Sequence, residues 1–175
     1  RLRRVRNSTW IRELVSETKL SSSDFILPIF IRDGKNKIDP IKSMPGVYRY
    51  TIDKMDILIT KAIKLGIPMV AIFPYTPENK KDKYGTESVN DDNLVCKAIN
   101  YIKKKYSKIG IMCDVALDPY TTHGHDGIII NNKIDNDKTL DILAQQSLIQ
   151  AQMGCDVIAP SDMMDGRIGK IRKHL

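Results

Sequence analysis

The residues best suited to chemistry lie in one segment, 114–127, which carries three aspartates, two histidines and two threonines. Asp118 and Asp126 have a proline and a glycine between them, so a loop can fold the two carboxylates face to face. Carboxylates suit Mg²⁺, water or a cationic amine, and they suit Zn²⁺ less well than thiolates do. His123 and His125 leave two alternatives open: they ligate a metal as a pair, or they cap loop carbonyls and pair with Asp126.

A second polar segment, 159–167, follows the last predicted strand. Ser161 and Asp162 come first in it and are expected to face the site. For Asp162, a purely local capping role is an equal alternative, because loop aspartates commonly cap turns. Asp165 is expected to cap the following helix, with Arg167 in its first turn.

Apolar runs and helical spacings alternate from residue 25 onward. Continuous apolar strands between amphipathic helices predict an α/β fold with a parallel sheet, and polar residues at the strand ends predict a site there. A hairpin is predicted at about 127–135. The absence of a glycine-rich phosphate loop disfavours a nucleotide-binding fold. The predicted strands are 25–31, 69–73, 109–115 and 156–160, and the predicted helices are 53–65, 91–106, 137–153 and 166–175.

The 175 residues suit one domain with an appended arm. Residues 1–24 combine clustered arginines with Trp10 and are predicted to contact another subunit, the alternative being a frayed terminus. Residues 25–175 hold about four βα units, half of a (β/α)8 barrel. Half a barrel leaves two bare strand edges and an open apolar interior, so this part belongs to something larger or associates strongly.

Composition excludes several classes of protein. The net charge is +7, but the lysines are scattered among acidic residues, so we expect no nucleic-acid partner and, at most, an anionic small substrate. Three widely spaced cysteines, with no C-x-x-C pair, indicate a reducing cytoplasm. No apolar run approaches the roughly 20 residues that span a bilayer, and no apolar stretch follows the basic N-terminus, so neither a membrane segment nor a secretory signal is expected.

Four segments of the sequence resemble the 5-aminolevulinate dehydratase (porphobilinogen synthase) family, and the likeness runs in register through the whole chain. They are Met44–Arg49, 114–127, Asn136–Asp137 and 160–167. The resemblance implies a TIM (β/α)8 barrel, an N-terminal arm that embraces a neighbouring subunit, and a homo-octamer. It also implies the condensation of two 5-aminolevulinate molecules to porphobilinogen, a step of tetrapyrrole and heme biosynthesis.

The resemblance also implies which metal the site uses. Zinc-using members of the family place three cysteines where this sequence has Ala116, Asp118 and Asp126. The chain is thus similar to the aspartate-rich branch, which uses Mg²⁺ or monovalent cations and holds no catalytic zinc. Asp118 and Asp126 would bind the amine of the second 5-aminolevulinate, directly or through water or a cation, and are the candidate metal ligands. Asp114 and Ser161 would support the site by hydrogen bonds.

The family's two Schiff-base lysines lie on strands beyond the one that ends at Pro160. Lys170 and Lys173 do not replace them, because they belong to a predicted outer helix with a solvated face. The sequence is therefore expected to be the N-terminal half of the enzyme and to be inactive alone. The alternative is a non-catalytic half-barrel that serves as an assembly or regulatory module.

Overall fold

The centre of the computed structural model is a six-stranded sheet with the strand order β2-β3-β1-β4-β5-β8. The structure describes residues 3–175, so Arg1 and Leu2 of the predicted arm lie outside it. Every neighbouring pair in this sheet is parallel except β2 with β3. The strands are β1 (Ile26–Arg32), β2 (Ile38–Pro40), β3 (Tyr48–Tyr50), β4 (Met69–Tyr75), β5 (Gly110–Val115) and β8 (Val157–Pro160), with β6 (Ile129–Ile130) and β7 (Lys133–Ile134) in a separate pair.

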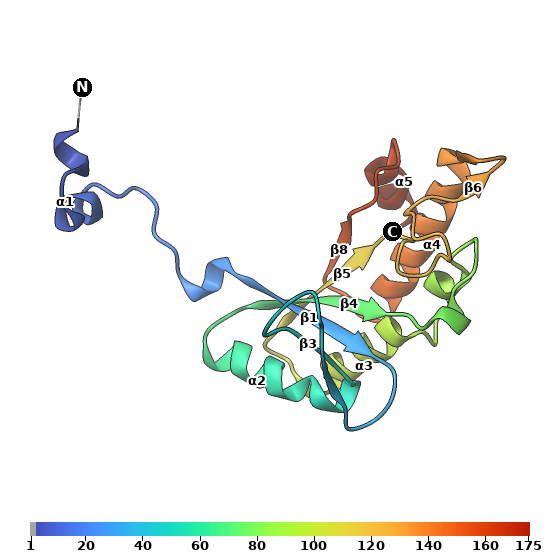
Figure 1. The fold of residues 1–175 in the computed structure, drawn as a ribbon, viewed down its shortest axis with the longest axis horizontal. Coiled ribbons are helices and arrows are strands. Elements are labelled where there is room, and N and C mark those ends of the chain that lie inside the picture. The colour runs from blue at the N-terminus through green and yellow to red at the C-terminus, as the bar shows by residue number, and fades with distance from the viewer. Residues whose placement is uncertain (1–2) are drawn as a thin grey trace.

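Helices follow the strands in alternation (Figure 1). The expected α/β fold with a parallel sheet is confirmed, and each long predicted element appears with its ends shifted by a few residues. Strands β2 and β3 were not predicted, because three-residue strands carry no apolar run that marks them. The helices are α1 (Thr9–Leu14), α2 (Asp56–Lys64), α3 (Leu94–Lys105), α4 (Asn136–Gln152) and α5 (Arg167–His174).

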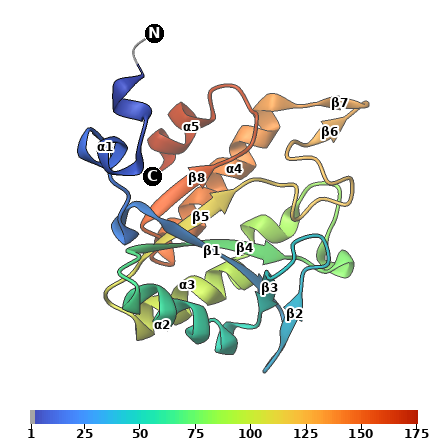
Figure 2. The same ribbon diagram turned by 60° about the vertical axis from the view of Figure 1, so that its left-hand side comes forward.

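The order β1-β4-β5-β8 adds each new strand of the βα series on the same side of the previous one. Right-handed crossovers therefore place the helices on one face of the sheet, as in a barrel. A doubly wound sheet would instead reverse its direction of growth at a switch point. Figure 2 shows α2 and α3 running along the sheet, and the strand order matches half of a (β/α)8 barrel.

The hydrophobic core lies between the sheet and these helices. Strand residues alternate between the two faces, and in β5 the fully buried Ile111, Cys113 and Val115 face the helices. The other face carries half-buried side chains, among them Phe30 and Phe73, whose ring centres lie 5.6 Å apart. This second face is the uncovered apolar interior expected of half a barrel.

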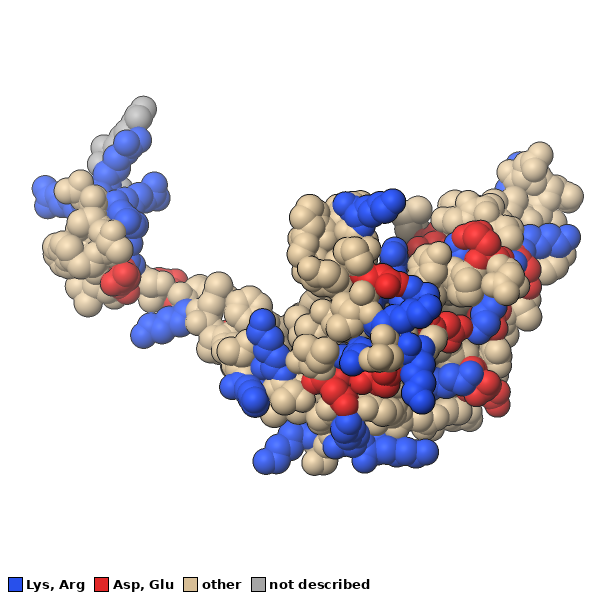
Figure 3. Space-filling view, turned by 60° about the horizontal axis from the view of Figure 1, so that its bottom comes forward, with Lys and Arg blue, Asp and Glu red and all other residues tan. Residues whose placement is uncertain are grey.

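The N-terminal arm extends away from the sheet as a short helix on an irregular linker (Figure 1). Its large apolar side chains are exposed: Trp10 is 65% exposed, Leu14 75% and Leu20 77%. In Figure 3 the arm shows clustered basic side chains, whereas basic and acidic side chains are interspersed over the body. Exposed apolar groups on a detached arm suit contact with another surface.

A hairpin forms within the range where one was expected. Strands β6 and β7 pair antiparallel, and Asn131 and Asn132 form the turn with φ of 50° and 59°. Two consecutive left-handed residues give the turn that fits the twist of a hairpin.

Within residues 3–175, no helix is both long enough and apolar enough to cross a membrane.

The core predicts a clear contrast between two isoleucines. Ile99 of α3 is fully buried against the sheet, whereas Ile57 of α2 is 52% exposed. We expect Ile99→Ala to lower the free energy of unfolding by about 2–5 kcal/mol, because it leaves a cavity. Ile57→Ala should change it by no more than about 0.5 kcal/mol. Urea denaturation measures both, and equal effects would contradict the packing described.

Candidate active site

The pairing of β5 with β8 brings the two polar segments together. In this parallel ladder Asp114 lies opposite Ala159, and the Ser161 N–H donates to the Val115 carbonyl at 3.3 Å. Both segments therefore leave the sheet at its carboxyl edge, side by side (Figure 2). This edge is where α/β proteins collect their functional groups.

Asp114 projects from the open face of the sheet. Its neighbours Cys113 and Val115 are fully buried on the helix side, so alternation turns the half-buried Asp114 the other way. Burial raises the pKa of Asp114, and the charges of Asp118 and Asp162 raise it further. The nearby Ser161 side chain lowers this pKa and partly offsets the rise, while the support of Asp114 by Ser161 stays a prediction.

Asp118 and Asp126 lie in one loop and interact electrostatically. Asp118 lies within a turn in which the Leu117 carbonyl accepts from the N–H groups of Tyr120 and Thr121 at 2.8 and 3.0 Å. Partial burial of its carboxyl is the largest cause of the raised pKa of Asp118, although the residue as a whole is exposed, and the nearby charge of Asp126 adds to it. The charges of the two carboxylates thus influence each other across the loop.

Asp126 also connects the loop after β5 to the loop after β8. Its Oδ2 accepts from the Met163 N–H at 3.0 Å. Its Oδ1 lies 2.9 Å from Nδ1 of His125. The four candidate residues Asp114, Asp118, Asp126 and Ser161 are thus gathered at one edge, while their catalytic role stays a prediction.

Asp162 is part of this cluster, a placement that the sequence left undecided. The residue is 1% exposed, its Oδ1 accepts from the Met164 N–H at 2.7 Å, and its Oδ2 lies 3.5 Å from Nε of Arg167. Burial raises the pKa of Asp162, and Asp126 adds to the rise, whereas Arg167 lowers it. Asp162 therefore both caps its loop and belongs to the carboxylate cluster.

Two local expectations receive different answers. Asp165 does not cap α5, which begins after Gly166 at φ 78° without a side-chain cap; the Asp165 N–H instead donates to Asn136 at 2.8 Å. His123 and His125 bond to the loop, because Nδ1 of His123 accepts from the His125 N–H at 3.1 Å and Nδ1 of His125 accepts from the Gly127 N–H at 3.0 Å. Nε2 of His123 also lies 3.3 Å from the Lys83 carbonyl, a contact that fits a carbonyl cap, and the choice between the two alternatives stays a prediction.

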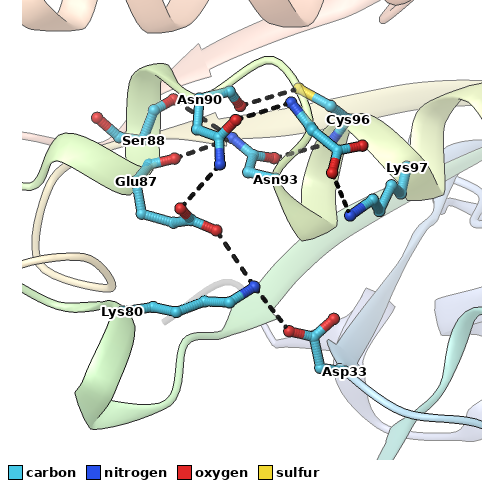
Figure 4. A network of polar contacts seen from close by, with 9 residues as sticks. Asp33, Lys80, Glu87, Ser88, Asn90, Asn93, Cys96 and Lys97 are labelled. Carbon is cyan, nitrogen blue, oxygen red and sulfur yellow. Dashed lines mark hydrogen bonds and ion pairs between the residues drawn. The ribbon is translucent and has the colours of Figure 1, made fainter.

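A second loop, after β4, supports the carboxylate loop from the side. The Asp82 N–H donates to the Tyr120 carbonyl at 3.3 Å, and the Asp82 carbonyl accepts from Thr122 at 3.0 Å. Figure 4 shows how this supporting loop is held: Lys80 bonds to Asp33 at 3.0 Å and lies 3.4 Å from Glu87. These links join the ends of three strands, and nothing in the sequence pattern marked them.

The donor set limits how a cation could be held. Across residues 3–175, no three histidine, cysteine, aspartate or glutamate side chains converge so that they could hold a metal ion. Mg²⁺ in proteins is commonly held by one or two carboxylates and several waters, so Asp118 and Asp126 fit that mode.

The three thiols lie away from this cluster. Cys96 and Cys113 are buried on the helix side of the sheet, and Cys155 is half-buried beside them.

The two lysines of α5 are not placed for Schiff-base chemistry. Both are exposed, and Nζ of Lys170 lies 2.6 Å from Asp141 of α4. A nucleophilic lysine needs surroundings that keep its amine neutral, which an exposed ion pair does not provide. Lys170 and Lys173 therefore belong to the solvated surface.

The raised pKa of Asp114 predicts how stability depends on pH. The pKa of this carboxyl is raised in the folded state above its ordinary value of 3.8, so the unfolded state loses its proton first as the pH rises. The free energy of unfolding therefore falls between pH 3.8 and the raised pKa, and the loss persists at higher pH. Asp114→Asn removes this cost, so the variant should become more stable relative to the unaltered protein across that interval and remain so at neutral pH. Thermal melts over a pH series measure the difference. Asp91→Asn, at an exposed position, controls for net charge. An Asp114→Asn protein that is less stable than the unaltered protein at neutral pH would contradict burial as the cause of the raised pKa.

The chain matches known proteins along its whole length. A model of the family described as delta-aminolevulinic acid dehydratase matches residues 1–175. Delta-aminolevulinic acid dehydratase of Bradyrhizobium diazoefficiens is 50% identical over 175 residues, which are 100% of this chain and 50% of that protein. The protein of the same name from Chlamydia pneumoniae is 44% identical over 100% of this chain and 53% of its own length.

A solved structure agrees with the sequence comparisons. The crystal structure of Toxoplasma gondii delta-aminolevulinic acid dehydratase (porphobilinogen synthase), in complex with the reaction product porphobilinogen, superposes with a TM-score of 0.93 at 37% identity. The match covers 100% of this chain and 50% of that one, so the chain spans about half the length of the relatives it matches. On these matches, the chain belongs to the delta-aminolevulinic acid dehydratase family.

Proposed function

We propose that this chain is the N-terminal half of a porphobilinogen synthase, a lyase that condenses two 5-aminolevulinate molecules to porphobilinogen in tetrapyrrole and heme biosynthesis. Membership of the family supports the reaction. The observation that carries the proposal is the carboxylate cluster at the edge shared by β5 and β8, where Asp114, Asp118 and Asp126 lie together. A cluster of negative charge suits the amino end of an amino-keto acid.

In this proposal each residue of the cluster has a distinct task. Asp118 and Asp126 bind the ammonium group of the second 5-aminolevulinate, because two adjacent carboxylates stabilise one positive charge. Asp114, whose pKa is raised by burial, is suited to hold or move a proton, and Ser161 orients it by hydrogen bonding. The Schiff-base lysines come from the other half of the enzyme.

The remaining proposals concern the cation and the assembly. Asp118 and Asp126 would hold Mg²⁺, or a monovalent cation, which supplies positive charge between two carboxylates that otherwise repel each other. No catalytic zinc is proposed, since oxygen atoms replace the thiolates of a zinc site. The exposed Trp10 and Leu14 of the arm would pack on a neighbouring subunit of a homo-octamer in the cytoplasm.

The direct test is product formation by the full-length protein. Incubation with 5-aminolevulinate should yield porphobilinogen, a general chelator should reduce the rate, and added Mg²⁺ should restore it. Strong inhibition by a zinc-selective chelator would contradict the proposed cation. A mature chain close to 175 residues that makes no product would overturn the proposal and favour a non-catalytic half-barrel.

Removal of one carboxylate predicts a specific defect. Asp126→Ala in the full-length enzyme should lower kcat by about 10²-fold or more, because the amine loses its partner and the Met163 N–H loses its acceptor. The melting temperature should change little. Asp91→Ala removes an exposed aspartate as the matched control. Near-normal turnover of the Asp126 variant would remove this residue from the site.

A further inference from the structure

The site-bearing end of β5 lacks a strand partner on one side. The pairing of β4 with β5 ends at Ile72 with Cys113, whereas β5 continues beside β8 to Val115 with Pro160. Strand β4 meanwhile stays with β1 as far as Tyr75. The sheet therefore splays open between β4 and β5, directly below the carboxylate cluster.

This splay leaves two carbonyl groups without a partner in the sheet. Successive carbonyls of a strand point to alternate sides, and those of Ile111 and Val115 accept from Asp156 and Ser161 on the β8 side. The carbonyls of Asp114 and Ala116 consequently point toward the gap that β4 has left. Buried carbonyls need a donor, because an unpaired one costs stability.

Two buried glutamines of α4 supply these donors. Nε2 of Gln150 donates to the Asp114 carbonyl at 3.0 Å, and Nε2 of Gln146 donates to the Ala116 carbonyl at 3.4 Å. Gln146 is 1% exposed and Gln150 is 2% exposed. Four residues of a helix advance about 6 Å and two residues of a strand about 6.6 Å, so the two glutamines match the spacing of the two carbonyls.

The glutamines carry a cost that packing alone does not explain. The Oε1 atoms of both are buried and have no hydrogen-bond partner within the described part of the chain. An apolar side chain at either position would avoid the unpaired Oε1 atom, but it would leave the Ala116 or Asp114 carbonyl without its donor. Buried polar atoms are normally hydrogen-bonded, and within residues 3–175 the Oε1 atoms of these two neighbouring glutamines are not. Such departures tend to occur where residues serve a functional site, so they point to a role for both glutamines in the site above them.

We propose that Gln146 and Gln150 are positioning residues: they hold the backbone of β5 from the helix side, where β4 no longer does, and so fix the direction of the Asp114 carboxylate. The Asp114 carbonyl and carboxylate belong to the same residue, so a rotation of its peptide plane moves the carboxylate away from Ser161. The same bonds hold the start of the loop that carries Asp118. This inference rests on the proposed function only for the expected change in kcat; the hold on the β5 backbone does not depend on it.

The test uses Gln150→Met and Gln146→Met in the full-length enzyme, with Gln152→Met at an exposed position of the same helix as the matched control. Methionine has a similar volume and no donor. Gln150→Met should lower kcat of the folded enzyme about tenfold and change KM less than twofold, because a misdirected group impairs the chemical step more than the first contact. Gln146→Met should have a smaller effect, since its bond is longer, and Gln152→Met should have none.

Hydrogen exchange provides a second readout that does not depend on activity. Peptides covering residues 112–121 should exchange faster in Gln150→Met and unchanged in Gln152→Met. A lower melting temperature with kcat, KM and exchange all unchanged would overturn the proposal, because the glutamines would then only stabilise the fold. If Gln150→Met does not fold, Gln146→Met decides by the same readouts. Failure of the proposed function can be told apart from failure of the positioning role. If the proposed function is wrong, the unaltered enzyme makes no product, while hydrogen exchange still reports whether the glutamines hold β5.

Discussion

The parallel pairing of β5 with β8 is the interaction on which the site depends. It sets Asp114 opposite Ala159, so the two polar segments leave the sheet at the same edge. Close carboxylates repel one another, and partial burial makes their charges more costly still. Strand pairing, the bond from the Ser161 N–H to the Val115 carbonyl and the bonds from the Met163 and Met164 N–H groups hold together a cluster that electrostatics alone would disperse.

The alternation of β5 separates the chemistry from the core. Cys113 and Val115 join the dry layer under the helices, while Asp114 stands on the open face. One strand can therefore be anchored by burial on one side and carry a titratable group on the other. The glutamines of α4 extend this anchoring beyond the last β4 partner, to the point where β5 becomes a loop.

Much of the architecture could be predicted from local pattern. Continuous apolar runs such as 69–73 mark buried strands by themselves, and the helix that ends before Gly66 has a clear period. The short strands β2 and β3 escaped because their pairing with each other and with β1, rather than their own residues, makes them strands. The cap expected from Asp165 was wrong because Gly166, in the left-handed conformation, takes the N-cap position of α5, while Asn136, distant in sequence, binds the Asp165 N–H.

The sequence by itself determined the kinds of groups available: carboxylates rather than thiolates in segment 114–127, and a proline and a glycine that let the loop fold back. Only the tertiary structure decided which groups meet. The burial of Asp162, the bond from Met163 to Asp126 and the reach of Gln150 to Asp114 join residues that lie far apart in the chain. Such contacts follow from how strands and helices pack, and local periodicity contains no information about that packing.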